Sequence, residues 1–336
     1  MNLSPCSDNM DFDSIKEYLK PELDRVMTLM KSSLSSDIAL LEMTNRKILS
    51  RSGKQVRPVI ALLSAKACSG GFVSEDTIHY AAATELLHNA SLLHDDVADN
   101  SPTRRGEPTV MSLLGGRAAV LLGDYWLVKG VDNILAGKTS SEKVIKIFSK
   151  TLSDLAEGEM LQLQKAECCD TLEQDYYKII YNKTASLFVT SANAAAISVG
   201  ASDEKRRSVK SYAECLGLAF QIRDDIFDYE DGISTGKPGG LDLMERKITL
   251  PLLGALANVS TDKAKEIRRK ICQIDENPEY QKEIVAFVHS DAGMEYAFRR
   301  LGEYVEKAKI SLRPLGYGRD VEMLADIADF VAYRKS

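Results

Sequence analysis

Apolar residues recur at intervals of three and four positions along almost the whole chain. One such series is Ile15, Leu19, Leu23, Val26 and Met30. This spacing is typical of amphipathic helices, and no segment shows the sustained alternation that is typical of strands. Helix breakers are scarce, with 9 prolines and 21 glycines in 336 residues. The sequence therefore predicts an all-α fold, a single large bundle of roughly 10–13 helices.

Composition and charge limit the classes of function. Lys and Arg number 43 and Asp and Glu 49, so the net charge of −6 lacks the basic character of a nucleic-acid-binding protein. The longest uncharged run, Thr184 to Ser202, is long enough for a membrane span, but its Ser, Thr and Asn residues favour a buried helix. No linker rich in Pro, Ser or Gly divides the chain. We predict one domain over residues 1–336, with no nucleic-acid partner and no membrane span.

The N-terminal segment and the cysteines indicate a cytoplasmic protein. Asp8, Asp11 and Asp13 occur where a secretory signal would need basic and then apolar residues. The six cysteines include no Cys-x-x-Cys pair, and Cys168 and Cys169 are adjacent. Such spacing is rare in zinc sites and in disulfide frameworks, so reduced thiols are expected.

Two short acidic motifs each end an apolar helix. The first reads Asp-Asp-Val-Ala-Asp and the second Asp-Asp-Ile-Phe-Asp. Residues i and i+4 share a helix face at about 6 Å, so Asp95 pairs with Asp99 and Asp224 with Asp228. Like charges so close destabilise a helix unless solvent or a cation lies between them. Carboxylate oxygens without nearby thiols or imidazoles are the ligands that Mg²⁺ prefers.

Either motif alone is compatible with a solvated acidic helix end, whereas two copies favour a common role. Mg²⁺ usually keeps several waters and is completed by substrate phosphates, so the two motifs predict a diphosphate held between them by metal ions. Cations that could assist occur at Lys54, Arg57, Arg104, Arg105, Lys237 and Lys247. A nucleotide P-loop is excluded, because the chain has no Gly-x-x-x-x-Gly-Lys-Ser/Thr sequence.

The order of the motifs resembles the trans-type polyprenyl diphosphate synthases, class I isoprenoid synthases of medium or long chain. From about Gly53 to the C-terminus the matching motifs are GKQVRP at 53–58, ELLH at 85–88, the two acidic motifs, RRG at 104–106, KT at 183–184, QIRDDIFD at 221–228, and GKP at 236–238 through to KITLP at 247–251. The resemblance implies that the helices surround a central cavity. It also implies a homodimer and three Mg²⁺ in each site.

The same resemblance implies a role for each motif residue. The metal ligands would be Asp95, Asp99, Asp224 and Asp228. The allylic diphosphate would be contacted by Arg104, Lys183 and Lys237. The diphosphate of isopentenyl diphosphate would be bound by Lys54, Arg57, His88 and Arg105, with Lys247 as a further substrate-binding cation. Thr184 and Gln221 would lie beside the developing allylic cation.

The implied reaction is a head-to-tail prenyl transfer. An allylic diphosphate ionises with the help of Mg²⁺, isopentenyl diphosphate attacks the cation, and a proton is lost as diphosphate is released. Apolar helix walls would exclude the water that hydrolyses such a cation.

The resemblance also implies that the growing prenyl tail runs in a tunnel beside the helix that ends near Asp95. Side chains on that helix would then limit the length of the product. Ala90 and Ser91 are small where short-chain members of the family carry bulky aromatics. We therefore expect a product longer than geranylgeranyl diphosphate, of the kind used for a quinone side chain, with a tunnel floor set deeper by Trp126. The alternative is that the two small residues only permit close helix packing.

Two other functional classes are compatible with part of this pattern. A terpene cyclase shares the first acidic motif, but its second motif would be of Asn/Ser/Glu type and it would lack a second diphosphate site. A non-catalytic partner subunit has little reason to keep both acidic motifs. Incubation with Mg²⁺ and both diphosphates separates the three, because only a synthase elongates the chain.

Overall fold

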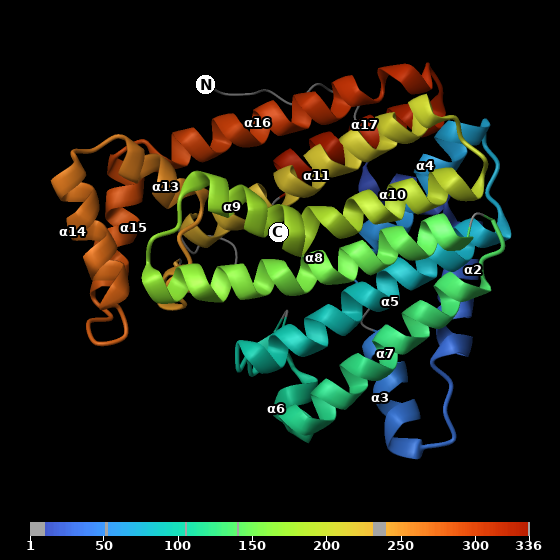
Figure 1. Ribbon diagram of the computed structural model, residues 1–336, viewed down its shortest axis with the longest axis horizontal. Coiled ribbons are helices and arrows are strands. Elements are labelled where there is room, and N and C mark those ends of the chain that lie inside the picture. Colours follow the sequence, from blue (N-terminus) through green and yellow to red (C-terminus); the bar gives the residue numbers. More distant parts are fainter. Residues whose placement is uncertain (1–10, 51–52, 105, 140, 231–239, 335–336) are drawn as a thin grey trace.

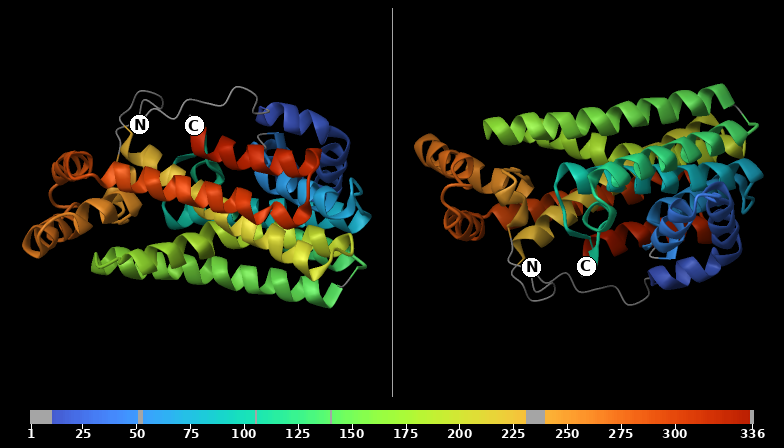
Figure 2. Two further views of the ribbon diagram at one scale, coloured as in Figure 1. Left: turned by 90° about the horizontal axis from the view of Figure 1, so that it is seen from above. Right: turned by 90° about the horizontal axis from the view of Figure 1, so that it is seen from below.

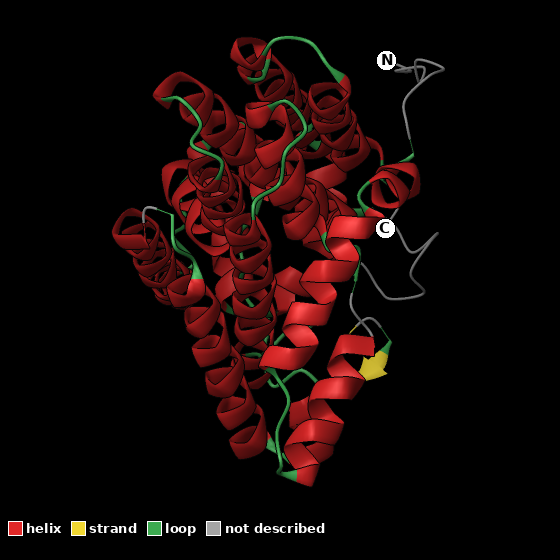
Figure 3. Ribbon diagram, turned by 90° about the vertical axis from the view of Figure 1, so that its right-hand side faces the viewer, coloured by secondary structure: helices red, strands yellow, loops and turns green. Residues whose placement is uncertain are grey.

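The computed structural model describes residues 11–50, 53–104, 106–139, 141–230 and 240–334, and helices dominate these residues (Figures 1 and 3). The α-helices are α1(Phe12–Tyr18), α2(Lys20–Ser33), α3(Ala39–Ser50), α4(Val56–Ser69), α5(Glu75–Ala98), α6(Val110–Leu114), α7(Gly116–Ala136), α8(Ser141–Cys168), α9(Glu173–Ile180), α10(Ser186–Ser198), α11(Asp203–Tyr229), α12(Leu241–Met244), α13(Leu250–Ala257), α14(Thr261–Cys272), α15(Tyr280–Ser290), α16(Gly293–Ser311) and α17(Arg319–Tyr333). A π-helix, η1(Tyr181–Ala185), joins α9 to α10, and a 3-10 turn, η2(Arg313–Leu315), precedes α17. The strands β1(Thr103–Arg104) and β2(Glu107–Pro108) pair in an antiparallel hairpin.

The predicted all-α class is confirmed. Among the described residues, twelve α-helices have ten residues or more, which agrees with the predicted number, and α1, α6, α9, α12 and α13 are shorter additions. No helix in the described part of the chain is long and apolar enough to cross a membrane. The interpretation of residues 1–336 as one domain stays a prediction.

Long helices run side by side and enclose α10 (Figures 1 and 2). Every residue of α10 is buried, and the helix packs against α4, α5, α8 and α11. The uncharged run from Thr184 to Ser202 thus contains a buried helix, as predicted, and its last four residues lie beyond the end of α10. Its small and apolar side chains suit this place, because burial of apolar surface is the main force that favours folding.

Local capping determines where the long helices begin. The Ser74 side chain accepts a hydrogen bond from the backbone N–H of Thr77 and so starts α5, and Ser202 caps α11 in the same way through Lys205. Such caps satisfy backbone donors that have no partner within the helix. The two acidic motifs lie at the far ends of these two helices.

Two glycines on α7, together with Gly137 that caps its C-terminal end, bring α7 unusually close to α5. A Cβ atom at any of them would lie closer than 3.0 Å to a side chain of α5. The contacts are Gly123 with His94, Gly130 with Leu87, and Gly137 with Tyr80. Because the glycines and their partners both recur every seven residues, α7 packs along α5 over about four turns, a repeat that the sequence analysis did not recognise. The packing supports the helix that carries Asp95.

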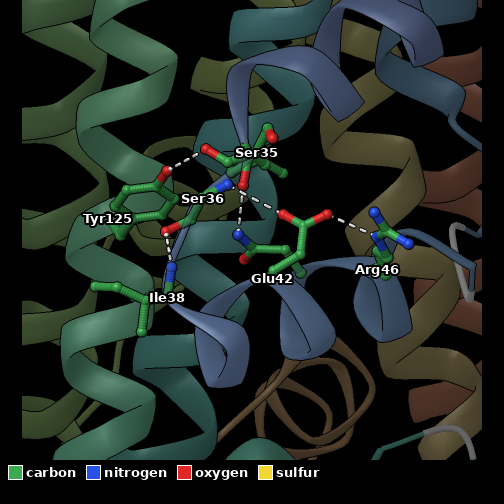
Figure 4. Close-up of polar contacts among 8 residues, drawn as sticks. Ser35, Ser36, Ile38, Glu42, Arg46 and Tyr125 are labelled. Carbon is green, nitrogen blue, oxygen red and sulfur yellow. Dashed lines mark hydrogen bonds and ion pairs between the residues drawn. The ribbon is translucent and has the colours of Figure 1, made fainter.

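The α2–α3 hairpin packs against α5 and also hydrogen bonds to α7 (Figure 4). Glu42 accepts hydrogen bonds from the backbone N–H of Ser36 at 3.1 Å and from Arg46 Nε at 2.6 Å. The Tyr125 hydroxyl on α7 donates to the Ser35 carbonyl at 3.4 Å. At the opposite end of the molecule, α14 and α15 extend beyond the long helices (Figures 1 and 2).

Candidate functional site

A cavity lies where α8, α9, η1 and α11 meet the segment between α12 and α13. Its wall includes Lys183, Gln221, Asp225, Asp242 and Lys247. The sequence analysis selected Lys183, Gln221 and Lys247 from this group, and the fold brings them together although Lys183 and Lys247 are 64 positions apart.

The first acidic motif ends α5 beside this cavity. Asp95 lies in the last turn, and Asp99 caps the helix. Burial, with Glu159 and Asp99 nearby, raises the pKa of Asp95 to about 6 despite the opposing charges of Lys183 and Arg104. The middle residue, Asp96, is buried and accepts a hydrogen bond from Arg104 Nε at 2.7 Å. Asp95 and Asp99 thus form the close acidic pair that the i,i+4 spacing predicts.

Lys183 lies near acidic side chains from two distant segments, Asp95 on α5 and Asp242 on α12. The positive charge of Lys183 opposes the rise in the pKa values of Asp95 and Asp242, so both carboxyl groups are within its electrostatic reach. Its Nζ contacts Glu159 Oε2 on α8 at 2.5 Å. The π-helix η1 places it there, and π-helical turns inside α-helices are frequent at functional sites.

A hydrogen-bonded chain runs from η1 to α11 and α9. The Thr184 hydroxyl donates to Gln221 Oε1 at 2.8 Å, and Gln221 Nε2 donates to Asp225 Oδ1 at 2.9 Å. The Tyr176 hydroxyl donates to Asp225 Oδ2 at 2.6 Å. The predicted pair Thr184 and Gln221 is therefore in direct contact.

The rest of the second motif faces α12 and its neighbours. Asp228 accepts backbone hydrogen bonds from Leu241 at 2.9 Å and from Asp242 at 3.1 Å, which caps the short α12. Loss of solvent and the charge of Asp228 raise the pKa of Asp242 to about 7, although part of its surface is accessible. Burial would lower the pKa of Lys247, but Asp242 and Glu245 outweigh burial and raise it.

Asp224 lies at the edge of this group. Its Oδ1 is 2.5 Å from an Arg334 guanidinium nitrogen, near the end of α17. Arg334 also lies over the Phe220 ring, 4.0 Å from the centroid. The C-terminal segment thus reaches a residue predicted to bind metal, which the sequence analysis did not foresee.

The cations near the N-terminus of α4 form a separate group. Arg57 is buried, with its guanidinium 4.7 Å from the centre of the Phe188 ring. Lys54 is exposed, with Nζ 5.1 Å from the centre of the Phe330 ring on α17. His88 is half-buried on α5, two turns before Asp95. Of the remaining predicted cations, Arg105 and Lys237 lie outside the described residues.

Sequence reasoning missed Glu159, Asp225 and Asp242 as parts of the site. Asp225 and Asp242 lie inside motifs that the analysis quoted, but their orientation depends on helices distant in sequence. Burial and the nearby Asp242 raise the pKa of Asp225 to about 8. Glu159 follows Gly158, where a Cβ atom would lie 2.7 Å from Asn182 Cβ. The close approach of α8 to η1 at that glycine is a sequence signal that could have identified Glu159.

The donor set suits a divalent cation that is completed by substrate. Among the described residues, no three carboxylates, imidazoles or thiols are close enough to hold a metal by themselves. Asp225 and Asp242 line the cavity, and the pKa values of Asp95, Asp225, Asp228 and Asp242 are all raised. Hard oxygen ligands of this kind fit Mg²⁺ that takes its remaining ligands from phosphate and water.

The raised carboxyl pKa values predict a pH-dependent stability. The folded pKa of Asp242, about 7, exceeds its ordinary value of 3.8, so the folded state binds the proton more tightly. Its contribution to stability is therefore lost as the pH rises through 7. Asp242→Asn should raise the melting temperature of the metal-free protein at pH 8 by about 2–5 °C, and less at pH 6. Scanning calorimetry in EDTA would test this, and a difference independent of pH would contradict it.

Comparisons with known proteins all point to one protein family. The family model for polyprenyl synthetase matches residues 38–288. An octaprenyl diphosphate synthase from Escherichia coli is 34% identical over 307 residues, which cover 91% of this chain and 94% of that protein. One from Haemophilus influenzae is 36% identical over 302 residues, 90% of each chain.

Two solved structures match the fold of this chain over almost its entire length. The crystal structure of a decaprenyl diphosphate synthase from Rhodobacter capsulatus has a TM-score of 0.89 at 30% identity and covers 96% of this chain and 99% of that one. A polyprenyl synthase from Caulobacter crescentus, complexed with calcium and isoprenyl diphosphate, has a TM-score of 0.89 at 29% identity, with 98% and 100% covered.

Proposed function

Because the chain belongs to the polyprenyl synthetase family, it is a prenyltransferase that elongates a prenyl diphosphate, and we propose which of its residues perform the reaction. The product is longer than geranylgeranyl diphosphate, in keeping with relatives that are octaprenyl and heptaprenyl diphosphate synthases. One observation carries the assignment of residues. Lys183, whose charge acts on Asp95 of the first motif, lines the same cavity as Asp225 of the second motif.

The allylic diphosphate would lie in that cavity. Asp95 and Asp99 on one side and Asp224 and Asp228 on the other would hold three Mg²⁺, which when bound neutralise the diphosphate and make it a better leaving group. Lys183 would exchange its contact with Glu159 for a diphosphate oxygen. Arg104, Lys247 and Lys237 would add charge-assisted hydrogen bonds, which are stronger than neutral ones.

Thr184 and Gln221 would face the carbon chain of the allylic substrate. Their oxygen dipoles stabilise a developing carbocation without donating electrons to a covalent bond. Isopentenyl diphosphate would bind beside them, with its diphosphate on Lys54, Arg57, His88 and Arg105. Its double bond attacks the cation, and the released diphosphate takes the proton. The buried helices around η1 exclude the water that would otherwise hydrolyse the cation.

A homodimer and a cytoplasmic location are part of the proposal. Helix α7 exposes Leu121, Val128 and Leu135, which recur every seven residues and are each more than half accessible. An apolar stripe of this kind favours burial against a second copy, which sedimentation velocity would detect as twice the mass of 37.1 kDa. The described cysteines are free thiols, in keeping with a reducing compartment.

If the two diphosphates bind at separate sites, loss of a cation at one site should raise the KM of one substrate more than that of the other. Lys54→Ala should raise the KM for isopentenyl diphosphate about 10- to 100-fold, because a charge-assisted hydrogen bond contributes about 1.5–3 kcal/mol. The KM for the allylic substrate should change less. Lys54 is exposed, so its removal spares the core. Steady-state kinetics with each substrate varied in turn test this, and equal effects on both KM values would refute two sites.

The tunnel hypothesis predicts that a bulky residue one turn before Asp95 shortens the product. Ser91 is half-buried on the same side of α5 as Asp95, and Ala90 is buried. Ser91→Phe and Ala90→Phe should each shorten the main product while turnover stays within about tenfold. Chromatography of the dephosphorylated products measures chain length. Unchanged length in both folded variants would mean that the tail does not pass this part of α5.

Trp126 lies on α7, the helix that packs against α5. Its ring is fully buried, and Nε1 donates to Asn45 Oδ1 at 2.8 Å. Its role as the floor of the tunnel stays a prediction.

A further inference from the structure

Tyr176 belongs to none of the motifs that point to the reaction, yet it lines the cavity beside Gln221 and Asp225. Its side chain is buried, and its hydroxyl donates to Asp225 Oδ2 at 2.6 Å. The other carboxylate oxygen of Asp225 accepts from Gln221 Nε2 at 2.9 Å. Tyr176 and Gln221 therefore hold Asp225 from both sides.

This arrangement determines which way the Gln221 amide faces. Gln221 directs its NH₂ group at Asp225 and its carbonyl oxygen at Thr184. The Thr184 hydroxyl then donates its single proton to Gln221 Oε1, at 2.8 Å. The oxygen lone pairs of Thr184 remain directed elsewhere, away from that bond.

We infer that Tyr176 is a positioning residue for prenyl transfer, which fixes Asp225 and through it the amide of Gln221 and the hydroxyl of Thr184. The inference rests on the proposed function, in which Thr184 and Gln221 stabilise the allylic cation. Without the Tyr176 hydroxyl, the Asp225 carboxylate can rotate and the Gln221 amide can turn over. An inverted amide directs its NH₂ group at Thr184, and the Thr184 proton then turns toward the cation, which it repels.

Tyr176→Phe removes only the hydroxyl and keeps the packed ring. We expect kcat to fall about 10- to 100-fold, the range for a buried hydrogen-bonding group that loses its partner. The KM for isopentenyl diphosphate should change by less than about twofold, since the diphosphate-binding cations are untouched. Tyr177→Phe is a matched control, because the neighbouring hydroxyl accepts from Arg300 Nε at 2.9 Å and makes no contact with Asp225.

A double-mutant cycle with Gln221→Ala separates positioning from a general structural effect. Single-turnover measurements with enzyme in excess keep the slow variants measurable. If Tyr176 acts through Gln221, Tyr176→Phe should change the rate by less than about twofold in the Gln221→Ala background. Equal losses in both backgrounds, or an unchanged kcat for Tyr176→Phe alone, would overturn the inference. A Gln221→Ala variant with normal turnover would instead overturn the proposed function of Gln221.

Discussion

Replacing Asp95 with alanine is expected to lower turnover at least about 10³-fold at saturating Mg²⁺, while the protein stays folded. Asp95 lies at the end of α5, where burial and the neighbouring carboxylates of Glu159 and Asp99 raise its pKa to about 6. Its carboxylate therefore contributes no net stability to the metal-free fold. The same carboxylate would be a metal ligand, so its loss weakens the charge stabilisation of the leaving diphosphate. We expect Asp224→Ala to have the same effect.

Asp76 on the same helix is a control for Asp95, because its carboxylate has a structural role far from the predicted metal ligands. Its carboxylate accepts backbone hydrogen bonds from Lys138 and Thr139, and it lies at the opposite end of α5. Asp76→Ala should reduce the melting temperature and leave the turnover of each folded molecule unchanged. Circular dichroism and steady-state kinetics on both variants separate the two roles. Near-normal activity of Asp95→Ala would show that the metal assignment is wrong.

Gly217→Ala should lower turnover about 100-fold and the free energy of unfolding by about 1–3 kcal/mol. A Cβ atom at Gly217 would lie 2.6 Å from the Cα atom of Ala185, a backbone atom that has no rotamer to move aside. Gly217 precedes Gln221 by one helical turn, and Ala185 directly follows Thr184. The methyl group would therefore push α11 away from η1 and lengthen the hydrogen bond between Thr184 and Gln221.

Gly302→Ala on α16 is the matched control for this change. A Cβ atom at Gly302 would meet nothing within 4 Å, so alanine adds helix propensity without a clash. Its stability should rise by about 0.5–1 kcal/mol with unchanged turnover. Urea denaturation and kinetics measure both quantities. Normal turnover in Gly217→Ala would contradict the claim that this close approach positions the pair.

Much of the fold follows from short-range pattern. The three- and four-residue spacing of apolar side chains predicts the helices, and both acidic motifs lie at helix ends as expected, at Asp99 in α5 and at Asp228 in α11. The buried helix α10 also follows from composition, because its Ser, Thr and Asn side chains make it too polar for lipid. These features depend only on neighbouring residues, which is why the sequence suffices for them.

The parts that were missed depend on contacts between distant segments. The π-helix that orients Lys183 and Thr184 has no distinct sequence pattern, and it forms where α9 and α10 meet α8 and α11. Tyr176 and Asp225 are 49 positions apart, and Asp224 and Arg334 are 110 apart. Residue type indicates that each can hydrogen bond, but only the packing of the helices determines with which partner.

Incubation of the purified protein with Mg²⁺, an allylic diphosphate and isotopically labelled isopentenyl diphosphate tests the central claim most directly. The account predicts metal-dependent release of diphosphate and labelled linear prenyl diphosphates longer than twenty carbons, with none formed in EDTA or by Asp95→Ala. Cyclic hydrocarbons, or no condensation of the labelled substrate at any Mg²⁺ concentration, would contradict it.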